Sequence, residues 1–185
     1  MRFHQLEISD VWQIEPDLVE DNRGVFRRSF CALEFESNGL LPTVLQGNIS
    51  ENPKPKTLRG FHYQVPPHQE AKTLTCFSGA IFDVVVDLRP KSPTFLKWIS
   101  IELSAANRLS LYVPPGCANA YLTTKKETVI HYYMSEIFVP DSYRGFSFCD
   151  PQFKFTWPDA PEVMSEKDEL LPNLDINRLL IEFSE

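Results

Sequence analysis

The sequence predicts an all-β fold built from antiparallel strands, in the form of a sandwich or a barrel. Short segments of alternating or β-branched apolar residues recur along the chain with loops between them, as in residues 81–88 and 108–113. The chain also holds 15 prolines against 7 glycines, together with 14 phenylalanines. Aromatic residues favour strands and prolines favour turns, so this composition indicates a β-rich fold with many turns.

The individual strands are expected where apolar alternation ends at turn residues. Residues 81–88 run into an Arg-Pro-Lys-Ser-Pro loop, and residues 108–113 stop at Pro114-Pro115-Gly116. In chain order, the expected strands are residues 2–8, 10–15, 25–30, 43–47, 57–64, 81–88, 97–103, 108–113 and 128–134. Helix signals are weak, and we expect only short helices at residues 31–38 and 175–182.

Length and charge limit the classes of function. A chain of 185 residues with 43% hydrophobic residues is expected to form a single domain over residues 1–185 with a substantial core. The net charge of −7, without a long basic run, argues against binding to a nucleic-acid polymer. A small anionic ligand stays compatible with this charge, because a local arginine cluster can override it.

The sequence also predicts a cytoplasmic protein with no membrane partner. No apolar stretch is long enough to span a bilayer, and residues 1–4 do not begin a signal peptide. The four cysteines (Cys31, Cys76, Cys117 and Cys149) are widely spaced and form no CxxC pattern. In a reducing compartment they are expected to be free thiols instead of disulfides or zinc ligands.

The most informative segment is residues 58–64, which carry His62 next to an Arg-Gly-Phe sequence, with Lys72 following ten residues later. An imidazole titrates near neutral pH, so it can take a proton from a weakly acidic carbon. A nearby ammonium can then stabilise the oxyanion left behind. The alternative is a hydrogen-bonded histidine in the core, and this segment alone does not decide between the two.

Other chemistries find less support in the sequence. A metal-binding barrel needs several converging ligands, but the strand offers no His-x-His pair, and the remaining histidines (His4, His68 and His131) are not at ligand spacing. The sequence contains no Gly-x-Ser-x-Gly elbow, no GxGxxG loop and no Walker loop. We therefore expect neither a bound metal nor another cofactor.

Acid–base chemistry remains, with His62 as the base and Lys72 as the stabilising cation. Tyr132 is a candidate acid, and Asp168 can orient the imidazole. Each residue has an alternative role: Lys72 as a solvated side chain, Tyr132 as a core residue, and Asp168 as a helix cap in a tail whose other acids form a solvated face. Spacing alone does not join these residues into one site.

Taken together, these residues resemble the dTDP-4-dehydrorhamnose 3,5-epimerase family of metal-free cupins. The resemblance covers about residues 10–172 and is carried by residues 21–26, 46–50, 58–64, 70–72, 78–89, 92–95, 114–116, 150–151, 157–158 and 165–168. It implies a double-stranded β-helix (a cupin or jelly-roll fold) with a few short helices, in a homodimer that acts on a nucleotide sugar.

The resemblance also implies roles for the candidate residues. His62 would be the base, paired with Asp168, while Lys72 would stabilise an enolate at the C4 oxygen of the sugar. Tyr132 would return a proton from the opposite face. The sugar and diphosphate would be bound by Arg23, Gln46, Asn48 and Arg59, together with Asn119, which stands where the family usually has a histidine.

Three positions depart from the family pattern. The family's Gly-Phe-Ala-His-Gly turn reads Gly-Cys-Ala-Asn-Ala here, with Asn119 in place of the histidine. Arg28 replaces a glutamate that often follows the Arg-Gly motif, and Phe148-Cys149 replaces a tryptophan with Asn or Asp. An asparagine cannot carry a positive charge. We therefore expect an active enzyme with altered specificity, which handles dTDP-4-keto-6-deoxyglucose poorly or inverts one centre only.

The expected function is epimerisation at C3, C5 or both of a nucleotide-linked 4-keto-6-deoxyhexose, an isomerase reaction through an enolate that serves cell-surface polysaccharide synthesis. One alternative is a 3,4-ketoisomerase of the same fold, which needs a base and an acid but not on opposite faces. Another is a non-catalytic protein that binds sugar nucleotides. The joint presence of His62, Lys72, Tyr132 and Asp168 argues against that last alternative.

One local feature conflicts with this site. Strict alternation along a strand places Arg59 and His62 on opposite faces of the sheet. Both side chains can face one pocket only if the strand bends or bulges between them. Gly60 is the residue that would permit such a bulge.

Overall fold

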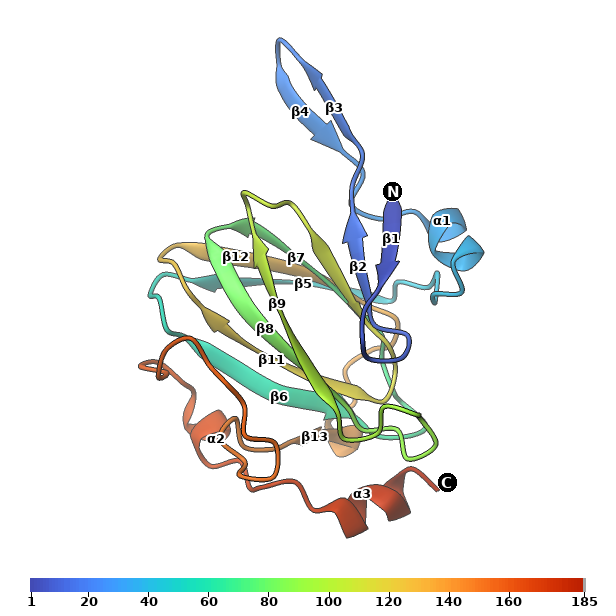
Figure 1. Cartoon of the computed structure of the whole chain (residues 1–185), viewed down its shortest axis with the longest axis vertical. Coiled ribbons are helices and arrows are strands. Elements are labelled where there is room, and N and C mark those ends of the chain that lie inside the picture. The colour runs from blue at the N-terminus through green and yellow to red at the C-terminus, as the bar shows by residue number, and fades with distance from the viewer. Residues whose placement is uncertain (185) are drawn as a thin grey trace.

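The computed structural model describes residues 1–184, which fold around two antiparallel sheets packed face to face (Figure 1). The six-stranded sheet has the order β1 (Arg2–Gln5), β2 (Trp12–Glu15), β10 (Ser110–Val113), β7 (Lys72–Ser78), β12 (Thr128–Met134) and β5 (Gln46–Asn52). The five-stranded sheet has the order β13 (Tyr143–Gly145), β6 (Leu58–Gln64), β11 (Cys117–Thr123), β8 (Ala80–Asp87) and β9 (Trp98–Ser104). This is the expected double-stranded β-helix.

All nine expected strands overlap a strand of the structure, although the segment expected at residues 43–47 begins three residues later, in β5. The prediction missed β3 (Leu18–Asp21), β7, β11 and β13. Five consecutive residues of β7 and all seven residues of β11 are buried. A strand buried on both faces loses the apolar–polar alternation by which strands are recognised in a sequence.

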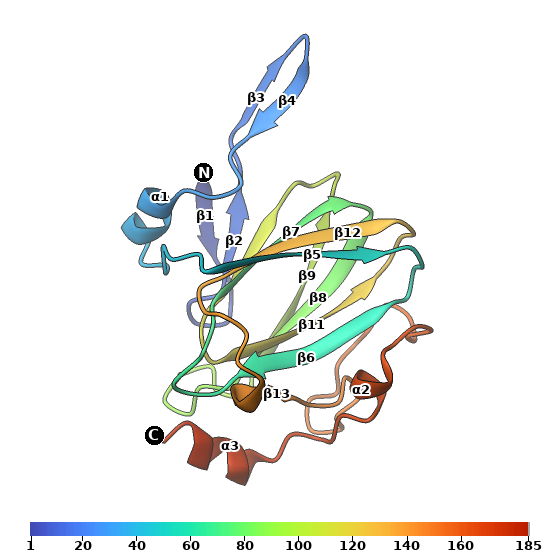
Figure 2. The ribbon, with the colours of Figure 1, turned by 180° about the vertical axis from the view of Figure 1, so that it is seen from behind.

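A two-stranded hairpin projects from the sandwich, made of β3 (Leu18–Asp21) and β4 (Gly24–Arg27). Figures 1 and 2 show it reaching well beyond the two sheets from opposite viewing directions. Its apolar side chains are exposed, with Phe26 at 71% and Val19 at 59%. The hairpin therefore presents an apolar surface that the sandwich of its own chain does not cover.

The helices are short, as expected. The predicted segments correspond to α1 (Ala32–Ser37) and α3 (Ile176–Glu182), whereas α2 (Glu166–Glu169) was not predicted. The side chain of Ser165 caps α2 by accepting a hydrogen bond from the backbone N–H of Asp168. Among residues 1–184, no helix has the length and apolar character needed to cross a membrane.

The five-stranded sheet is covered on both faces. Between the sheets, its side chains pack with those of the other sheet around Leu111 and Ile130. On its outer face, Phe61 and Phe146 stack with ring centroids 4.5 Å apart, within a cluster that includes Leu174 and Leu179 of the C-terminal segment. That segment runs along β6, as Figure 2 shows, and places α2 beside this strand.

Strand β6 carries the bulge that the site requires. On β11, Asn119 pairs with His62 and Tyr121 pairs with Arg59, so β6 has one more residue than β11 over this stretch. The bulge includes Gly60, whose φ of +112° lies in a region that favours glycine. A Cβ atom on Gly60 would lie 2.6 Å from the carbonyl oxygen of Asn119. The bulge prediction is confirmed.

Replacing Gly60 by alanine should therefore destabilise the protein more than the same change at Gly24, in the turn of the exposed hairpin. Both glycines have a similar positive φ, of +112° and +122°, but a Cβ on Gly24 would meet nothing within 4 Å. The clash at Gly60 should lower the free energy of unfolding by about 1–3 kcal/mol beyond the loss at Gly24. Denaturant unfolding of both variants measures this difference, and equal losses would contradict the role of the bulge.

Candidate active site

A cavity of about 420 Å³ opens between the two sheets, next to β13 and α2. Its walls bring together all the predicted site residues except Arg23. The lining residues are Gln46, Asn48, Ser50, Arg59, His62, Gln64, Glu70, Lys72, Leu74, Asn119, Tyr121, Tyr132, Met134, Phe138, Tyr143, Ser165, Lys167 and Asp168. The bulge in β6 explains why both Arg59 and His62 belong to this set.

His62 and Asp168 form a close pair on one wall. The Nε2 atom of His62 lies 2.7 Å from Oδ1 of Asp168, and the backbone N–H of Gly60 donates to Oδ2 at 3.4 Å. Burial alone would raise the pKa of Asp168, but the hydrogen bond and the charge attraction with His62 bring it below its ordinary value. An ionised carboxylate only accepts hydrogen bonds, so Nε2 carries the proton and Nδ1 has the free lone pair.

The position of Asp168 follows from the C-terminal segment. The backbone N–H of Leu58 donates to the carbonyl of Val163 at 2.9 Å, and that of Glu162 donates to the carbonyl of Lys56, also at 2.9 Å. These bonds fix the segment along β6 just before α2 begins. Asp168 is 6% exposed, while Glu166 and Glu169 beside it are exposed. The single buried acid of this helix is therefore the one that reaches His62.

Lys72 places a buried ammonium in the same cavity. Its Nζ donates to the carbonyl of His62 at 2.8 Å and to Oδ1 of Asn119 at 3.1 Å. It also forms an ion pair with Glu70, at 3.1 Å. An ammonium has three N–H groups. The two hydrogen bonds therefore leave one N–H for Glu70 or for a ligand oxygen in the cavity.

Tyr132 faces His62 from the other sheet, because β12 belongs to the six-stranded sheet and β6 to the five-stranded sheet. Burial raises the pKa of its phenol, which a smaller attraction from Arg59 partly offsets. The phenol therefore keeps its proton at neutral pH. The cavity has a proton acceptor on one wall and a proton donor on the opposite wall.

Uncharged polar side chains and one arginine line the rest of the cavity near β5. Gln46 donates to Oδ1 of Asn48 at 3.0 Å, and Arg59 donates through Nε to Oδ1 of Asn52 at 3.0 Å. Because the partner of Arg59 is a neutral amide, its positive charge is not offset by that contact. Such a guanidinium suits a carboxylate or phosphate ligand.

Arg23 is not part of this arrangement, because it lies at the turn of the projecting hairpin. Its guanidinium is bound to the carboxylate of Asp21, two residues earlier, and its side chain is 85% exposed. It does not line the cavity of its own chain. The predicted role of Arg23 in substrate binding is not explained by a single chain.

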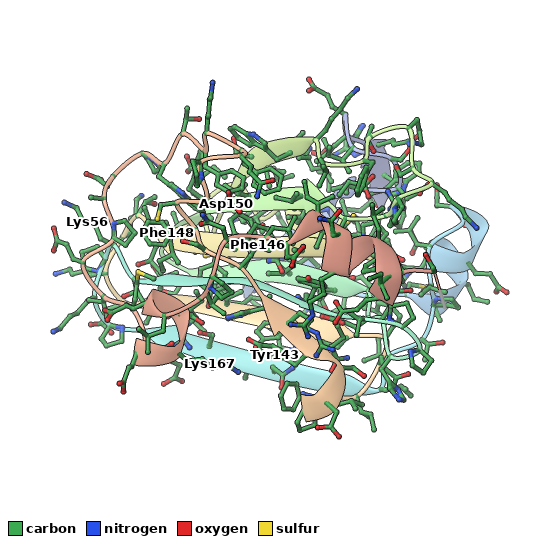
Figure 3. The ribbon with its side chains drawn as sticks, turned by 90° about the horizontal axis from the view of Figure 1, so that it is seen from below. Lys56, Tyr143, Phe146, Phe148, Asp150 and Lys167 are labelled. Atoms are coloured by element: carbon green, nitrogen blue, oxygen red, sulfur yellow. The ribbon has the colours of Figure 1, made fainter. Side chains whose placement is uncertain are left out.

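Several cavity residues were missed by the sequence analysis. The ring centroids of Tyr143 and His62 are 5.2 Å apart, and the Nζ atom of Lys167 lies 3.9 Å from the centroid of the Tyr143 ring (Figure 3). Phe138 meets the edge of Tyr143 at 5.3 Å. Glu70 and Lys167 lie inside segments that carried the family resemblance, so they could have been noticed. Phe138 follows β12 in a connection without a regular pattern, and Tyr143 begins β13, which at three residues is too short to show a strand pattern.

Behind Asn119 lies a buried acid, Asp83, on β8. The Nδ2 of Asn119 donates to Oδ2 of Asp83 at 3.2 Å. The other oxygen of this carboxyl, Oδ1 of Asp83, has no hydrogen-bond partner within the described part of the chain. Burial raises the pKa of Asp83 to about 8, against smaller opposing effects of Asn119 and Lys72. Asp83 is therefore largely protonated at neutral pH.

Over residues 1–184, the side chains of His, Cys, Asp and Glu form no group of three suited to hold a metal ion. What the cavity offers instead is a base with a paired carboxylate, an acid on the facing wall and a cation between them. This set can remove a proton from one face of a carbon acid, stabilise the resulting oxyanion and return a proton to the other face.

Comparison with known proteins agrees with this chemistry. The family model described as dTDP-4-dehydrorhamnose 3,5-epimerase matches residues 5–175. A curated relative, the dTDP-4-dehydrorhamnose 3,5-epimerase of Sinorhizobium fredii, is 38% identical over 175 residues, which cover 94% of this chain and 90% of the relative.

Solved structures are similar over almost the whole chain. The dTDP-4-dehydrorhamnose 3,5-epimerase of Bacillus anthracis, crystallised with TDP and PPi bound, has a TM-score of 0.90 at 34% identity, covering 94% of this chain and 99% of its own. ChmJ of Streptomyces bikiniensis, a 3'-monoepimerase in complex with dTDP-quinovose, has a TM-score of 0.86 at 29% identity, covering 98% and 100%.

The buried Asp83 leads to a prediction about stability and pH. Its pKa is raised from 3.8 to about 8, so the folded protein binds more protons than the unfolded chain between these values. The contribution of Asp83 to stability is then full below pH 4 and is lost as the pH rises through 8. Asp83→Asn should therefore gain stability relative to the wild type from pH 4 to pH 8, by up to several kcal/mol, since one pKa unit corresponds to about 1.4 kcal/mol.

Urea unfolding of both proteins at several pH values measures this trend. Asp168→Asn is the matched control with the opposite sign, because the pKa of Asp168 is lowered and its contribution is lost as the pH falls. A pH-independent difference between wild type and Asp83→Asn would show that Asp83 is ionised in the folded protein.

Proposed function

Because this chain belongs to the dTDP-4-dehydrorhamnose 3,5-epimerase family, it is a sugar-nucleotide epimerase, and we propose that its substrate is a nucleotide-linked 4-keto-6-deoxyhexose inverted at C3, C5 or both. One observation carries the proposed mechanism. The His62–Asp168 pair lies on one wall of the cavity and Tyr132 lies on the facing wall. The Lys72 ammonium lines the same cavity. A 3,4-ketoisomerase would not need its acid and base on opposite sides.

The first half of the reaction uses His62. A 4-keto group makes the hydrogens on C3 and C5 weakly acidic. The Nδ1 lone pair of His62 takes one of them, and the electron pair of the C–H bond moves into an enolate whose negative charge rests on O4. Asp168 stabilises the imidazolium that forms. The remaining N–H of Lys72 donates to O4 and stabilises the enolate.

The second half uses Tyr132. Its phenol donates a proton to the same carbon from the opposite face, which restores the ketone and inverts the centre. Burial keeps this phenol protonated until the enolate forms. Proton exchange with solvent then returns His62 and Tyr132 to their starting states. No electron is transferred to a second reagent, so the reaction balances without a redox partner.

The sugar and the diphosphate are proposed to be bound by Arg59, Gln46 and Asn48. These side chains line the cavity, and the hydrogen bonds they make within the protein are to neutral groups. We also keep the cytoplasmic location as a proposal.

The remaining predicted ligand, Arg23, is explained by a homodimer. The hairpin that carries it exposes Leu18, Val19, Val25 and Phe26, and the outer face of the six-stranded sheet exposes Ile49 and Phe77. A second copy of the chain would cover these apolar surfaces. In such a dimer, the hairpin of each subunit would bring Arg23 to the cavity of the other.

Isotope exchange tests the mechanism. The wild type, incubated in D₂O with dTDP-, GDP- and CDP-linked 4-keto-6-deoxyhexoses, should incorporate deuterium at C3, C5 or both. His62→Ala should lower exchange by about 10²–10⁴-fold, the usual effect of losing a general base. Tyr132→Phe should keep exchange with retained configuration while epimerised product falls sharply. Mass spectrometry and NMR measure the two quantities.

The matched control is Tyr133→Phe, on the same strand but directed to the other face, where its hydroxyl lies 3.4 Å from Ser29. This variant should behave like the wild type. Near-normal exchange in His62→Ala would contradict its role as base. Equal small losses in Tyr132→Phe and Tyr133→Phe would mean that Tyr132 only fills the cavity wall.

Mixed dimers test the role of Arg23. Arg23→Ala and His62→Ala subunits should each have little activity alone. If the hairpin acts on the partner, a mixed dimer has one complete site, with His62 from one subunit and Arg23 from the other. Random mixing by co-expression should then restore about a quarter of wild-type turnover. No recovery in dimers verified by mass would place Arg23 outside the partner's site.

A further inference from the structure

The side chain of Asn119 is already bound at both ends of its amide. Its Oδ1 accepts a hydrogen bond from Lys72 at 3.1 Å, and its Nδ2 donates one to Asp83 at 3.2 Å. Only 6% of the residue is exposed. A sugar hydroxyl that bound to this amide would have to displace an internal partner in a buried position, which costs free energy.

Lys72 and Asp83 together determine the orientation of the Asn119 amide. In the reversed orientation, the NH₂ group of Asn119 would point at the ammonium of Lys72, where two donors would face each other. Its carbonyl would face Oδ2 of Asp83, and the observed hydrogen bond in which Asp83 accepts from the amide would be lost. The hydrogen bond to Asp83 thus keeps the acceptor of Asn119 directed at Lys72.

Asp83 occupies a position that stability alone does not favour. On β8 it lies between Ile81 and Val85, both in the apolar cluster between the sheets, and it is fully buried. Its Oδ1 has no partner among the described residues. A buried carboxyl with an unpaired oxygen is unfavourable compared with an apolar side chain. The raised pKa of Asp83 is consistent with this environment.

Lys72 depends on the contact with Asn119 for its direction. Two of its three N–H groups are bound, one by the carbonyl of His62 and one by Oδ1 of Asn119. Two fixed bonds determine where the third N–H points, whereas one bond would leave the ammonium free to rotate. Without the Asn119 contact, the ion pair with Glu70 could draw the ammonium away from the ligand.

We propose that Asp83 and Asn119 are positioning residues that hold the Lys72 ammonium toward the enolate oxygen, and that Asn119 acts through Lys72 and not by binding the sugar. This inference rests on the proposed function in taking Lys72 as the cation that meets O4. It assigns a role to Asp83, and it replaces the predicted contact between Asn119 and the substrate by a contact with Lys72.

The proposal also predicts which side chains suit position 119. The position needs an acceptor toward Lys72 and a donor toward Asp83. A neutral imidazole offers the same pair on its two nitrogens, whereas a carboxylate lacks the donor and an alanine lacks both. Asn119→His should therefore keep turnover within a few fold and leave the preference among sugar nucleotides unchanged.

A double-mutant cycle on turnover tests the coupling. Asn119→Ala should lower kcat about 10–100-fold with KM nearly unchanged, because moving a catalytic group by about 1 Å can lower the rate by up to about 10²-fold. In a Lys72→Met background, Asn119→Ala should have no further effect, because it acts only through Lys72. Additive losses, or a loss confined to KM, would mean that Asn119 binds the substrate directly and would overturn the proposal.

A second measurement needs no substrate. In ¹⁵N-lysine-labelled protein, the ammonium signal that Lys72→Met removes belongs to Lys72. Asn119→Ala and Asp83→Leu should both shift this signal and speed its hydrogen exchange, while Asp83→Asn, whose carbonyl can still accept from Asn119, should change it less. Circular dichroism checks folding, and Asn119→Ala carries the test if Asp83→Leu does not fold.

An unchanged Lys72 signal in folded Asn119→Ala would overturn the proposal. The two hypotheses remain distinguishable. If the wild type exchanges no deuterium into any of the three sugar nucleotides, the proposed function fails, whereas a shifted Lys72 signal would still support the positioning of Lys72 by Asn119.

Discussion

The bulge at Gly60 is the constraint on which the cavity depends. A regular strand would direct Arg59 and His62 to opposite faces, and only one of them could reach a ligand between the sheets. The extra residue in β6 turns both inward and leaves the backbone N–H of Gly60 free to donate to Asp168. The same register sets Asn119 directly across from His62. One irregular residue therefore aligns a guanidinium, an imidazole and the carboxylate that orients it.

The tail of the chain completes what the bulge begins. The hydrogen bonds from Leu58 to Val163 and from Glu162 to Lys56 hold the C-terminal segment along β6, and the cap at Ser165 starts the short helix that carries Asp168. A four-residue helix has little stability of its own. Its position is maintained by these contacts and by the aromatic cluster under Phe61. A site on the inner face of β6 is thus supported from the outer face of the same strand.

The fold could be predicted from strand alternation, which is a local signal, whereas the residues that share the cavity were grouped in advance only through the family resemblance. Prediction failed where the signal is not local. Strand β11 is buried on both faces and shows no alternation. Tyr143 reaches the cavity from β13, a strand of three residues that is too short to show a pattern. Asn119 lines the cavity, but the sequence analysis predicted a contact with the substrate. Its hydrogen bonds to Lys72 and Asp83 join β11 to two strands more than 30 residues earlier in the chain.

Charge inside the cavity differs from charge on the whole molecule. The chain carries a net charge of −7, yet its proposed ligand is an anionic nucleotide sugar. The carboxylates of the cavity are engaged: Asp168 by His62, and Glu70 by Lys72. Arg59, by contrast, contacts a neutral amide, and Lys167 lies over an aromatic ring. The positive charges that meet no carboxylate therefore lie along the cavity wall, and a local field of this kind is strongest in a cleft with low-dielectric walls. Arg59 and Lys167 are the two side chains that we propose to attract the diphosphate of the ligand.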